Sequence, residues 1–202
     1  MTSKKKPPPK PAGPPRKPRK GVARGREHLD PAEMKQLIAA ARRLGRNGAR
    51  DALMIETAYR HGFRVAELVS LRRDQVNAAA GVMHVSRVKH GLPNIHPMTA
   101  AEIRELNKLI KGGPDSPYVF TTERGQPLTR STFFKIVARA GLKAGLPLSV
   151  HPHMLRHSCG FKLANEGKDT RAIQAWLGHV NIQHTVTYTA MSAERFKGFW
   201  KD

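Results

Sequence analysis

Cysteine, tyrosine and long apolar runs are scarce in this 202-residue sequence, which has one cysteine and three tyrosines. A single cysteine, Cys159, excludes a disulfide within the chain and fits a reducing compartment. No run of about 18 apolar residues is present, which argues against a membrane-spanning helix. The cationic start MTSKKK leads into proline-rich sequence instead of the apolar segment of a secretory signal. We therefore expect a cytoplasmic protein with no membrane partner.

Acidic residues are also few, since 15 Asp and Glu stand against 36 Lys and Arg, giving a net charge of +21. Residues 1–26 hold ten of these cations, seven prolines and no acid, and such a segment cannot bury apolar surface. We predict a disordered basic arm over residues 1–26 that either binds DNA phosphates or keeps the protein soluble. The candidate DNA-binding residues of the arm are Lys4, Lys5, Lys6, Lys10, Arg16, Lys17, Arg19 and Lys20.

The rest of the chain keeps a net charge of +11 once the ten cations of the arm are removed. That excess is the electrostatic footprint of a nucleic-acid-binding protein. A membrane surface is a weaker explanation, because no basic amphipathic helix or lipidation motif is evident.

Helical spacing of apolar residues dominates after the arm and predicts a mainly α fold with one small antiparallel β-sheet. Asp30, Pro31 and Glu33 form a capping-box start, and Thr99 with Glu102 resembles a second one. Residues 81–98 alternate around a His-Gly-Leu-Pro-Asn turn, which is typical of a β-hairpin. The predicted helices cover about 31–44, 48–61 (ended by Gly62), 65–71, 99–111, 129–144, 153–166, 170–177, 181–189 and 192–200.

Polar residues that could take part in catalysis or binding gather at the breaks and ends of these elements. The stretches are HGFRVAEL, the hairpin VKHG, HPHMLRHS and LGHVNIQHTVTYT. The residues they supply are Arg64, Glu67, Lys89, His153, Arg156, His179 and Tyr188.

Each residue alone has an ordinary structural explanation. Arg64 and Glu67 fit a surface ion pair, a hairpin lysine is usually only solvated, and His179 after a glycine fits the end of a helix. A lone tyrosine is most often a packing residue.

Zinc binding is an alternative for part of the set. His153 and His157 have the i, i+4 spacing of zinc-binding helices, with His151 and Cys159 nearby. No glutamate lies between the two histidines to act as a base, and no acid lies close to the cluster before Glu166. We therefore predict no metal site.

Taken together and in order, the set suits attack of a phenol on a DNA phosphodiester. Two guanidiniums can hold the nonbridging oxygens of the transition state without Mg²⁺. Cations or histidines can help a phenol of pKa near 10 to lose its proton, and a lysine on a hairpin can protonate the leaving 5′-oxygen.

These motifs resemble those of the tyrosine recombinases, the phage integrase family, over about residues 27–200. The resemblance implies an integrase-type catalytic domain over residues 27–202, following the arm. Its catalytic residues would be Arg64, Lys89, His153, Arg156, His179 and the nucleophile Tyr188, with Glu67 in support.

The C-terminal stretch from His151 to Trp200 is similar to the short fimbrial-type recombinases, which invert promoter segments in bacteria. Longer relatives carry a core-binding domain before the catalytic one, where this sequence has its basic arm. The resemblance implies a cytoplasmic, nucleoid-associated enzyme with double-stranded DNA as partner, a homotetramer on two DNA sites and no cofactor. It also leaves open whether the final helix docks on a neighbouring subunit.

The function that follows is site-specific recombination through a 3′-phosphotyrosyl intermediate, with inversion of a DNA segment as one outcome. Two alternatives stay open. A type IB topoisomerase would use nearly the same residues without pairing two DNA sites, and a non-catalytic architectural protein would explain only the charge.

Overall fold

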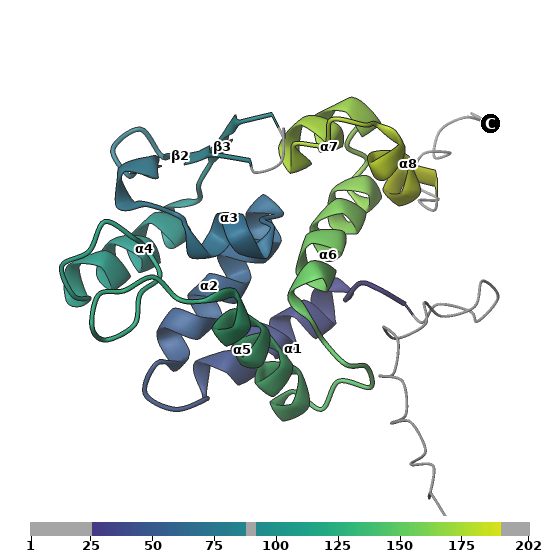
Figure 1. Cartoon of the computed structure of the whole chain (residues 1–202). Helices are drawn as coiled ribbons and strands as arrows, with labels where there is room; N and C mark the ends of the chain where they lie inside the picture. The colour runs from purple at the N-terminus through teal and green to yellow at the C-terminus, as the bar shows by residue number, and fades with distance from the viewer. Residues whose placement is uncertain (1–25, 88–91, 191–202) are drawn as a thin grey trace, which may run out of the picture.

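The computed structural model describes residues 26–87 and 92–190. Within these residues the chain is mainly helical with one three-stranded antiparallel sheet, as the sequence predicts (Figure 1). The helices are α1 (Pro31–Arg42), α2 (Gly48–His61), α3 (Val65–Val69), α4 (Ala100–Gly112), α5 (Arg130–Lys143), α6 (Pro152–Asn165), α7 (Thr170–Leu177) and α8 (Gln183–Ala190). A 3₁₀ turn, η1 (Arg73–Gln75), precedes the strands β1 (Val76–Asn77), β2 (Val82–Val85) and β3 (Asn94–Pro97). Residues 1–25 of the arm and the predicted helix 192–200 lie outside the described residues.

The first capping box is confirmed and the second is half wrong. The Asp30 side chain accepts hydrogen bonds from the amides of Ala32 and Glu33, and Glu33 Oε2 accepts from the Asp30 amide. Thr99 Oγ1 accepts from the Glu102 amide, but the Glu102 carboxylate turns into the core and contacts His61 Nε2 at 2.8 Å. Burying that carboxylate against an imidazole satisfies it better than the exposed Thr99 amide would.

The hairpin is confirmed, with strands shorter than the predicted span and with β1 as an unpredicted third strand. Strand β2 pairs with β3 in the register Met83 to His96, and β1 adds on its other side. Met83 and Val85 point into the core, as does His96, while Ile95 is 57% exposed. The alternation of β3 therefore buries its histidine and exposes its isoleucine. The turn at residues 88–91, which carries Lys89, lies outside the described residues.

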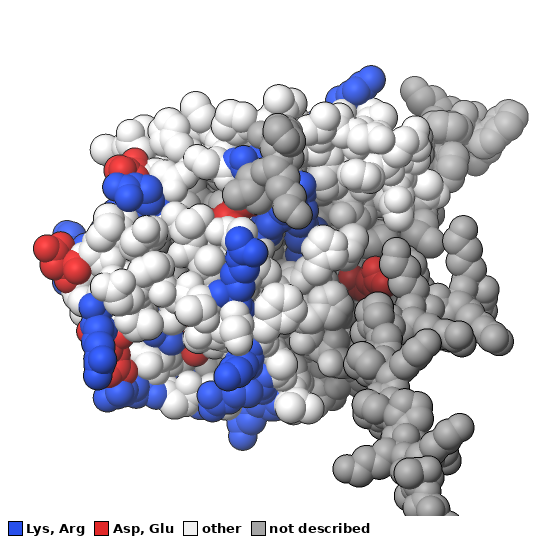
Figure 2. All heavy atoms as spheres, viewed as in Figure 1, with Lys and Arg blue, Asp and Glu red and all other residues white. Residues whose placement is uncertain are grey.

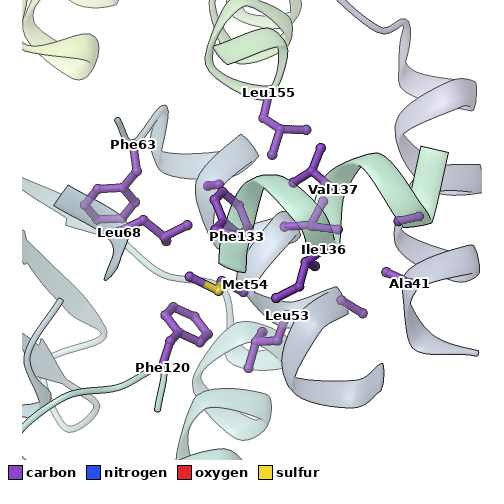
Figure 3. Packing of buried hydrophobic residues seen from close by; sticks show 14 of the residues in the cluster. Ala41, Leu53, Met54, Phe63, Leu68, Phe120, Phe133, Ile136, Val137 and Leu155 are labelled. Atoms are coloured by element: carbon purple, nitrogen blue, oxygen red, sulfur yellow. The ribbon is translucent and has the colours of Figure 1, made fainter. Parts of the chain in front are cut away.

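Helix α2 occupies the centre of the larger core and packs against α1 and α6. Figure 3 shows its Leu53 and Met54 facing side chains from α5 and α6. These partners are Phe133, Ile136, Val137 and Leu155. Because nearly every side of α2 is covered, its C-terminal end at His61 is fixed in space.

A second, smaller cluster joins α6, α7 and α8. It contains Cys159, Ala164, Ile173, Leu177 and Tyr188. Helix α6 therefore contacts the main core through Leu155 and the second cluster through Cys159, one turn further on. Figure 1 shows α6 running from the N-terminal half of the fold up to α7 and α8. No helix within the described part of the chain is long and apolar enough to span a bilayer.

Candidate active site

Two helix C-termini meet at the site. Helix α2 ends at Gly62 with φ +59°, and α7 ends at Gly178 with φ +63°. Both glycines are left-handed caps, which non-glycine residues adopt at a cost. A Cβ on Gly62 would lie 2.4 Å from Leu177 Cδ2, and one on Gly178 would lie 2.8 Å from Arg87 Cγ. The two helix ends therefore approach closely, and their last carbonyls need donors.

Arg156 supplies donors to both helix ends. Its side chain rises from α6, is 2% exposed, and donates from Nη1 to the Gly62 carbonyl at 2.5 Å and from Nη2 to the Leu177 carbonyl at 2.7 Å. Burial, followed by repulsion from Arg64 and Arg87, lowers the pKa of Arg156 to about 10. The guanidinium therefore remains charged at neutral pH and is held in one orientation.

Arg87 is a second buried guanidinium that the sequence analysis missed. Its side chain is fully buried, donates to Glu67 Oε2 at 2.9 Å, and reaches the carbonyls of His61 (3.1 Å) and Trp176 (2.5 Å). Burial lowers its pKa, which Glu67 partly offsets. Nothing in the sequence distinguishes Arg87 from the other cations except its place two residues before Lys89.

Glu67 is shared between Arg87 and Arg64. Arg64 Nη1 donates to Glu67 Oε1 at 2.8 Å, and the Arg64 amide donates to Oε2 at 2.9 Å. The Glu67 side chain is 0% exposed while that of Arg64 is 31% exposed, so the pair is no ordinary surface ion pair. Burial would raise the pKa of Glu67, but the Arg64 amide and the Arg87 charge outweigh it and hold the pKa below its usual value.

The charges of this cluster do not cancel. Three guanidiniums face one carboxylate, and each helix C-terminus contributes roughly half a negative charge. About one positive charge is therefore left over, which matches the single charge of a phosphodiester. Arg64, the most exposed of the three arginines, and Arg156 line a pocket of about 340 Å³. The other residues of the pocket are His153, His157, His179, His184, Thr187 and Tyr188.

Tyr188 of α8 forms the inner wall of this pocket and is 3% exposed. Its ring lies flat on Gly160, where a Cβ would be 2.6 Å from Cε2, and meets the Phe161 ring edge-on. The hydroxyl lies 3.0 Å from His157 Nδ1. Burial raises the pKa of Tyr188 to about 12, although Arg156 opposes this shift. A protonated phenol is thus placed beside guanidiniums and imidazoles.

The other predicted histidines line the same pocket. His179 is 6% exposed, its Nδ1 is 2.8 Å from Thr185 Oγ1, and its ring stacks at 6.3 Å from that of Tyr188. Its amide also donates to the Gln174 carbonyl, so the residue closes α7 as well as facing the pocket. His153 is exposed and touches His157 edge-on.

The structure thus brings together Arg64, His153, Arg156, His179 and Tyr188, with Glu67 beneath them. Lys89 and the arm candidates Lys4 to Lys20 lie outside the described residues.

Cys159 lies apart from these histidines. Its Sγ contacts the Arg60 carbonyl at 3.5 Å, and it lines a different pocket from the one that contains His153 and His157. Burial raises the pKa of its thiol to about 12. Cys159 is therefore separated from the histidines considered for zinc binding. Within the described residues, no group of three or more His, Cys, Asp or Glu side chains is arranged so that it could hold a metal ion.

We expect the free energy of unfolding to fall as the pH drops from about 6.5 to 5. Burial holds the pKa of His96 at about 3, that of His157 at about 4 and that of His179 at about 3. Their pKa in the unfolded chain is about 6.5. The unfolded chain therefore binds more protons in this range, and stability is lost as pH falls. The loss is up to about 2 kcal/mol per histidine at pH 5. Urea unfolding at pH 7, 6 and 5 measures it, and a constant free energy would contradict these pKa values.

Comparison with known proteins places the chain in one family. The profile of the phage integrase family matches residues 27–195. The type 1 fimbriae regulatory protein FimB of Escherichia coli (strain K12) is 41% identical over 180 residues, covering 87% of this chain and 90% of that protein. Tyrosine recombinase XerD of Ralstonia nicotianae is 33% identical over 176 residues, which are 84% of this chain and 57% of XerD.

The fold agrees with this relationship. The crystal structure of XerA recombinase matches with a TM-score of 0.70 at 28% identity, covering 80% of this chain and 59% of XerA. A family profile that spans most of the chain, together with relatives above 30% identity, establishes the relationship. The chain belongs to the phage integrase family and is a tyrosine site-specific recombinase.

Proposed function

We propose that Tyr188 attacks a DNA phosphodiester, forms a 3′-phosphotyrosyl bond and releases a 5′-hydroxyl. The observation that carries the proposal is the shared pocket. It places the phenol beside two arginines and a surplus of about one positive charge. Attack by the 5′-hydroxyl of a partner strand then reverses the chemistry and joins new ends. The ester keeps the energy of the broken bond, so the reaction needs neither ATP nor a metal.

Arg64 and Arg156 bind the nonbridging oxygens in this proposal, because their forks match two oxygens and their charge is fixed. Glu67 supports Arg64 from below. His153 and His179 contribute further donors, and Lys89 protonates the 5′-oxygen as it leaves.

Double-stranded DNA is the substrate in this proposal, and inversion of a DNA segment is the outcome that the similarity to FimB favours. Figure 2 shows Lys and Arg side chains running down the middle of one face, with acids mostly toward one edge. Such a basic surface neutralises phosphates and draws DNA to the pocket. The enzyme would act on the bacterial nucleoid, in the cytoplasm.

A covalent adduct and strand exchange test this function. A nicked suicide duplex loses the short strand after cleavage, so the protein–DNA bond accumulates and is seen on a denaturing gel. An architectural protein would give no adduct. Two labelled duplexes that each carry the target site then report strand exchange, which a type IB topoisomerase would not perform.

Assembly of four subunits on two DNA sites completes the proposal. A largely apolar pocket of about 570 Å³ opens between α1, α2 and α6, with Met34, Tyr59 and Leu163 in its walls. Residues 192–200, SAERFKGFW, supply three aromatic side chains that would fill such a pocket on a neighbouring subunit. Removing residues 192–202 should then prevent synapsis and leave binding to a single site intact.

Lys89→Ala should slow cleavage of normal DNA and spare a substrate with a 5′-bridging phosphorothiolate. The sulfur leaves without being protonated, so a general acid is no longer needed. Single-turnover rates on the two substrates measure the effect. Equal losses on both would show that Lys89 is not the general acid.

Deleting residues 1–26 should weaken the salt dependence of DNA binding. Each phosphate contact contributes about 0.9 to the log–log slope, so engagement of roughly three to five of the ten cations predicts a slope flatter by about 3 to 4.5 units. Discrimination between target and random DNA should change little, because phosphate contacts carry no sequence information. Titrations at several salt concentrations measure both quantities. Slopes that agree within about one unit would instead assign the arm to solubility.

A further inference from the structure

The hydroxyl of Tyr188 has a specific partner at the site, the imidazole of His157. His157 Nδ1 lies 3.0 Å from Tyr188 Oη, and the two rings meet edge-on at 5.8 Å between centroids. We propose that His157 is a catalytic residue, which accepts the phenol proton as Tyr188 attacks and returns it when the phosphotyrosyl bond is broken. This inference rests on the proposed phosphotyrosyl chemistry.

The position of His157 is fixed by its neighbours in the chain. Arg156 precedes it and is tied to the ends of α2 and α7 through two carbonyls, so this turn of α6 cannot rotate freely. The edge of the His153 ring meets the His157 ring at 4.4 Å between centroids. Both restraints hold Nδ1 toward Tyr188 before DNA arrives.

The ionisation of His157 suits a proton acceptor at neutral pH. Burial, and then the proximity of His153, lowers its pKa to about 4, so the ring is neutral. Donation from Tyr188 Oη requires the lone pair on Nδ1, which assigns the remaining ring proton to Nε2. The charged or titratable groups around His157 are His151, His153 and Arg156 of its own segment, Tyr188 of α8, and Glu27.

The proton transfer is coupled to the bond changes at phosphorus. The Oη–H bond breaks and Nδ1–H forms while Oη bonds to phosphorus and the 5′-oxygen departs with a proton from a separate donor. The pKa of the phenol, raised to about 12, lies far above that of His157, so a free phenolate is disfavoured before attack. The phenol becomes strongly acidic as Oη bonds to phosphorus, and the incoming phosphate charge stabilises the imidazolium that forms.

The other histidines of the pocket are less suited to this step, and His184 meets the His179 ring edge-on at 5.8 Å between centroids. His179 Nδ1 is already 2.8 Å from Thr185 Oγ1, and its ring stacks parallel to Tyr188 instead of pointing at the hydroxyl. His153 is exposed, and its ring meets that of His157 and not that of Tyr188. Both can face a bound phosphate while His157 faces the nucleophile.

His157→Asn separates proton transfer from orientation. The Asn Oδ1 can accept a hydrogen bond near the position of Nδ1, but an amide takes up no proton at neutral pH. With saturating enzyme and a nicked suicide duplex, we expect adduct formation to slow by on the order of 10²-fold or more. DNA affinity and the unfolding temperature, measured alongside, should stay close to those of the unaltered protein. An adduct rate within threefold of the unaltered protein would overturn the proposal.

Fluorinated tyrosine at position 188 supplies the second readout. The phenol of a fluorotyrosine is more acidic and depends less on a base. The fold-decrease in the rate of adduct formation caused by His157→Asn should therefore be at least tenfold smaller with fluorotyrosine than with tyrosine at position 188, and it should become smaller still as pH rises. His153→Asn is the matched control, and the fold-decrease in rate that it causes should be the same with tyrosine and with fluorotyrosine at position 188. If the fold-decrease caused by His157→Asn is the same with fluorotyrosine as with tyrosine, His157 only orients the Tyr188 hydroxyl, and its role as proton acceptor is overturned. If the unaltered protein itself forms no adduct, the proposed function fails first.

Discussion

Tyr188→Phe will abolish the covalent adduct and leave DNA affinity nearly unchanged. The substitution removes one oxygen and keeps the ring, whose packing against Gly160 and Phe161 depends on carbon atoms alone. The lost hydrogen bond, to His157, lies at the pocket surface, where water can replace it. We therefore expect adduct formation to fall below detection on a nicked suicide duplex, with a folded protein that still shifts DNA on a native gel.

Tyr118→Phe is the matched control for this experiment. Tyr118 lies beside Arg72 in an isolated β-bridge, far along the chain from the pocket, and only its backbone makes that contact. The control should form adduct at the rate of the unaltered protein. Adduct at the unaltered level in Tyr188→Phe would refute the assignment of the nucleophile.

Arg156→Lys will reduce the cleavage rate on the order of 10²–10³-fold although it keeps the charge. A lysine ammonium cannot present two parallel donors to phosphate oxygens. It also cannot reach the carbonyls of Gly62 and Leu177 together with the geometry that the guanidinium has. Single-turnover cleavage at saturating enzyme isolates the chemical step from binding.

The same substitution will destabilise the fold. Two hydrogen bonds from a charged donor contribute about 1.5–3 kcal/mol each, and leaving buried carbonyls unsatisfied adds to the loss. Arg60→Lys is a suitable control, because Arg60 contacts Glu56 at the exposed side of α2. A cleavage loss below threefold for Arg156→Lys would mean that Arg156 only positions the helix ends.

Local patterns in the sequence predicted most of the fold. Capping residues such as Asp30 and the break at Gly62 act within one or two turns, so they can be read without tertiary structure. The hairpin could be predicted from alternation, but its buried histidine could not. His96 is accommodated by stacking on Trp176, 80 residues later, with ring centroids 3.8 Å apart. The burial of the Glu102 carboxylate could not be predicted for the same reason, because its partner His61 is 41 residues away along the chain.

The sequence predicted which residues form the candidate site and their order along the chain. It did not predict the side chains that contact them and hold them in place. Arg64, His153, Arg156, His179 and Tyr188 stand in motifs and meet in one pocket. Arg87 and His157 were missed as members of the site, because their roles depend on partners far along the chain. Arg87 meets the end of α7, 89 residues away, and His157 meets a hydroxyl 31 residues away.

The attachment of two guanidiniums to backbone carbonyls determines which substitutions the site tolerates. A carbonyl is present whichever side chain stands at positions 61, 62, 176 and 177, so ordinary side-chain replacement cannot remove these acceptors. Replacement of the caps is different, because a Cβ on Gly62 or Gly178 would collide with Leu177 or Arg87 and push the two helix ends apart. Mutational sensitivity should therefore be high at two glycines that have no side chain to offer DNA. Random mutagenesis would recover inactive variants there as readily as at the tyrosine.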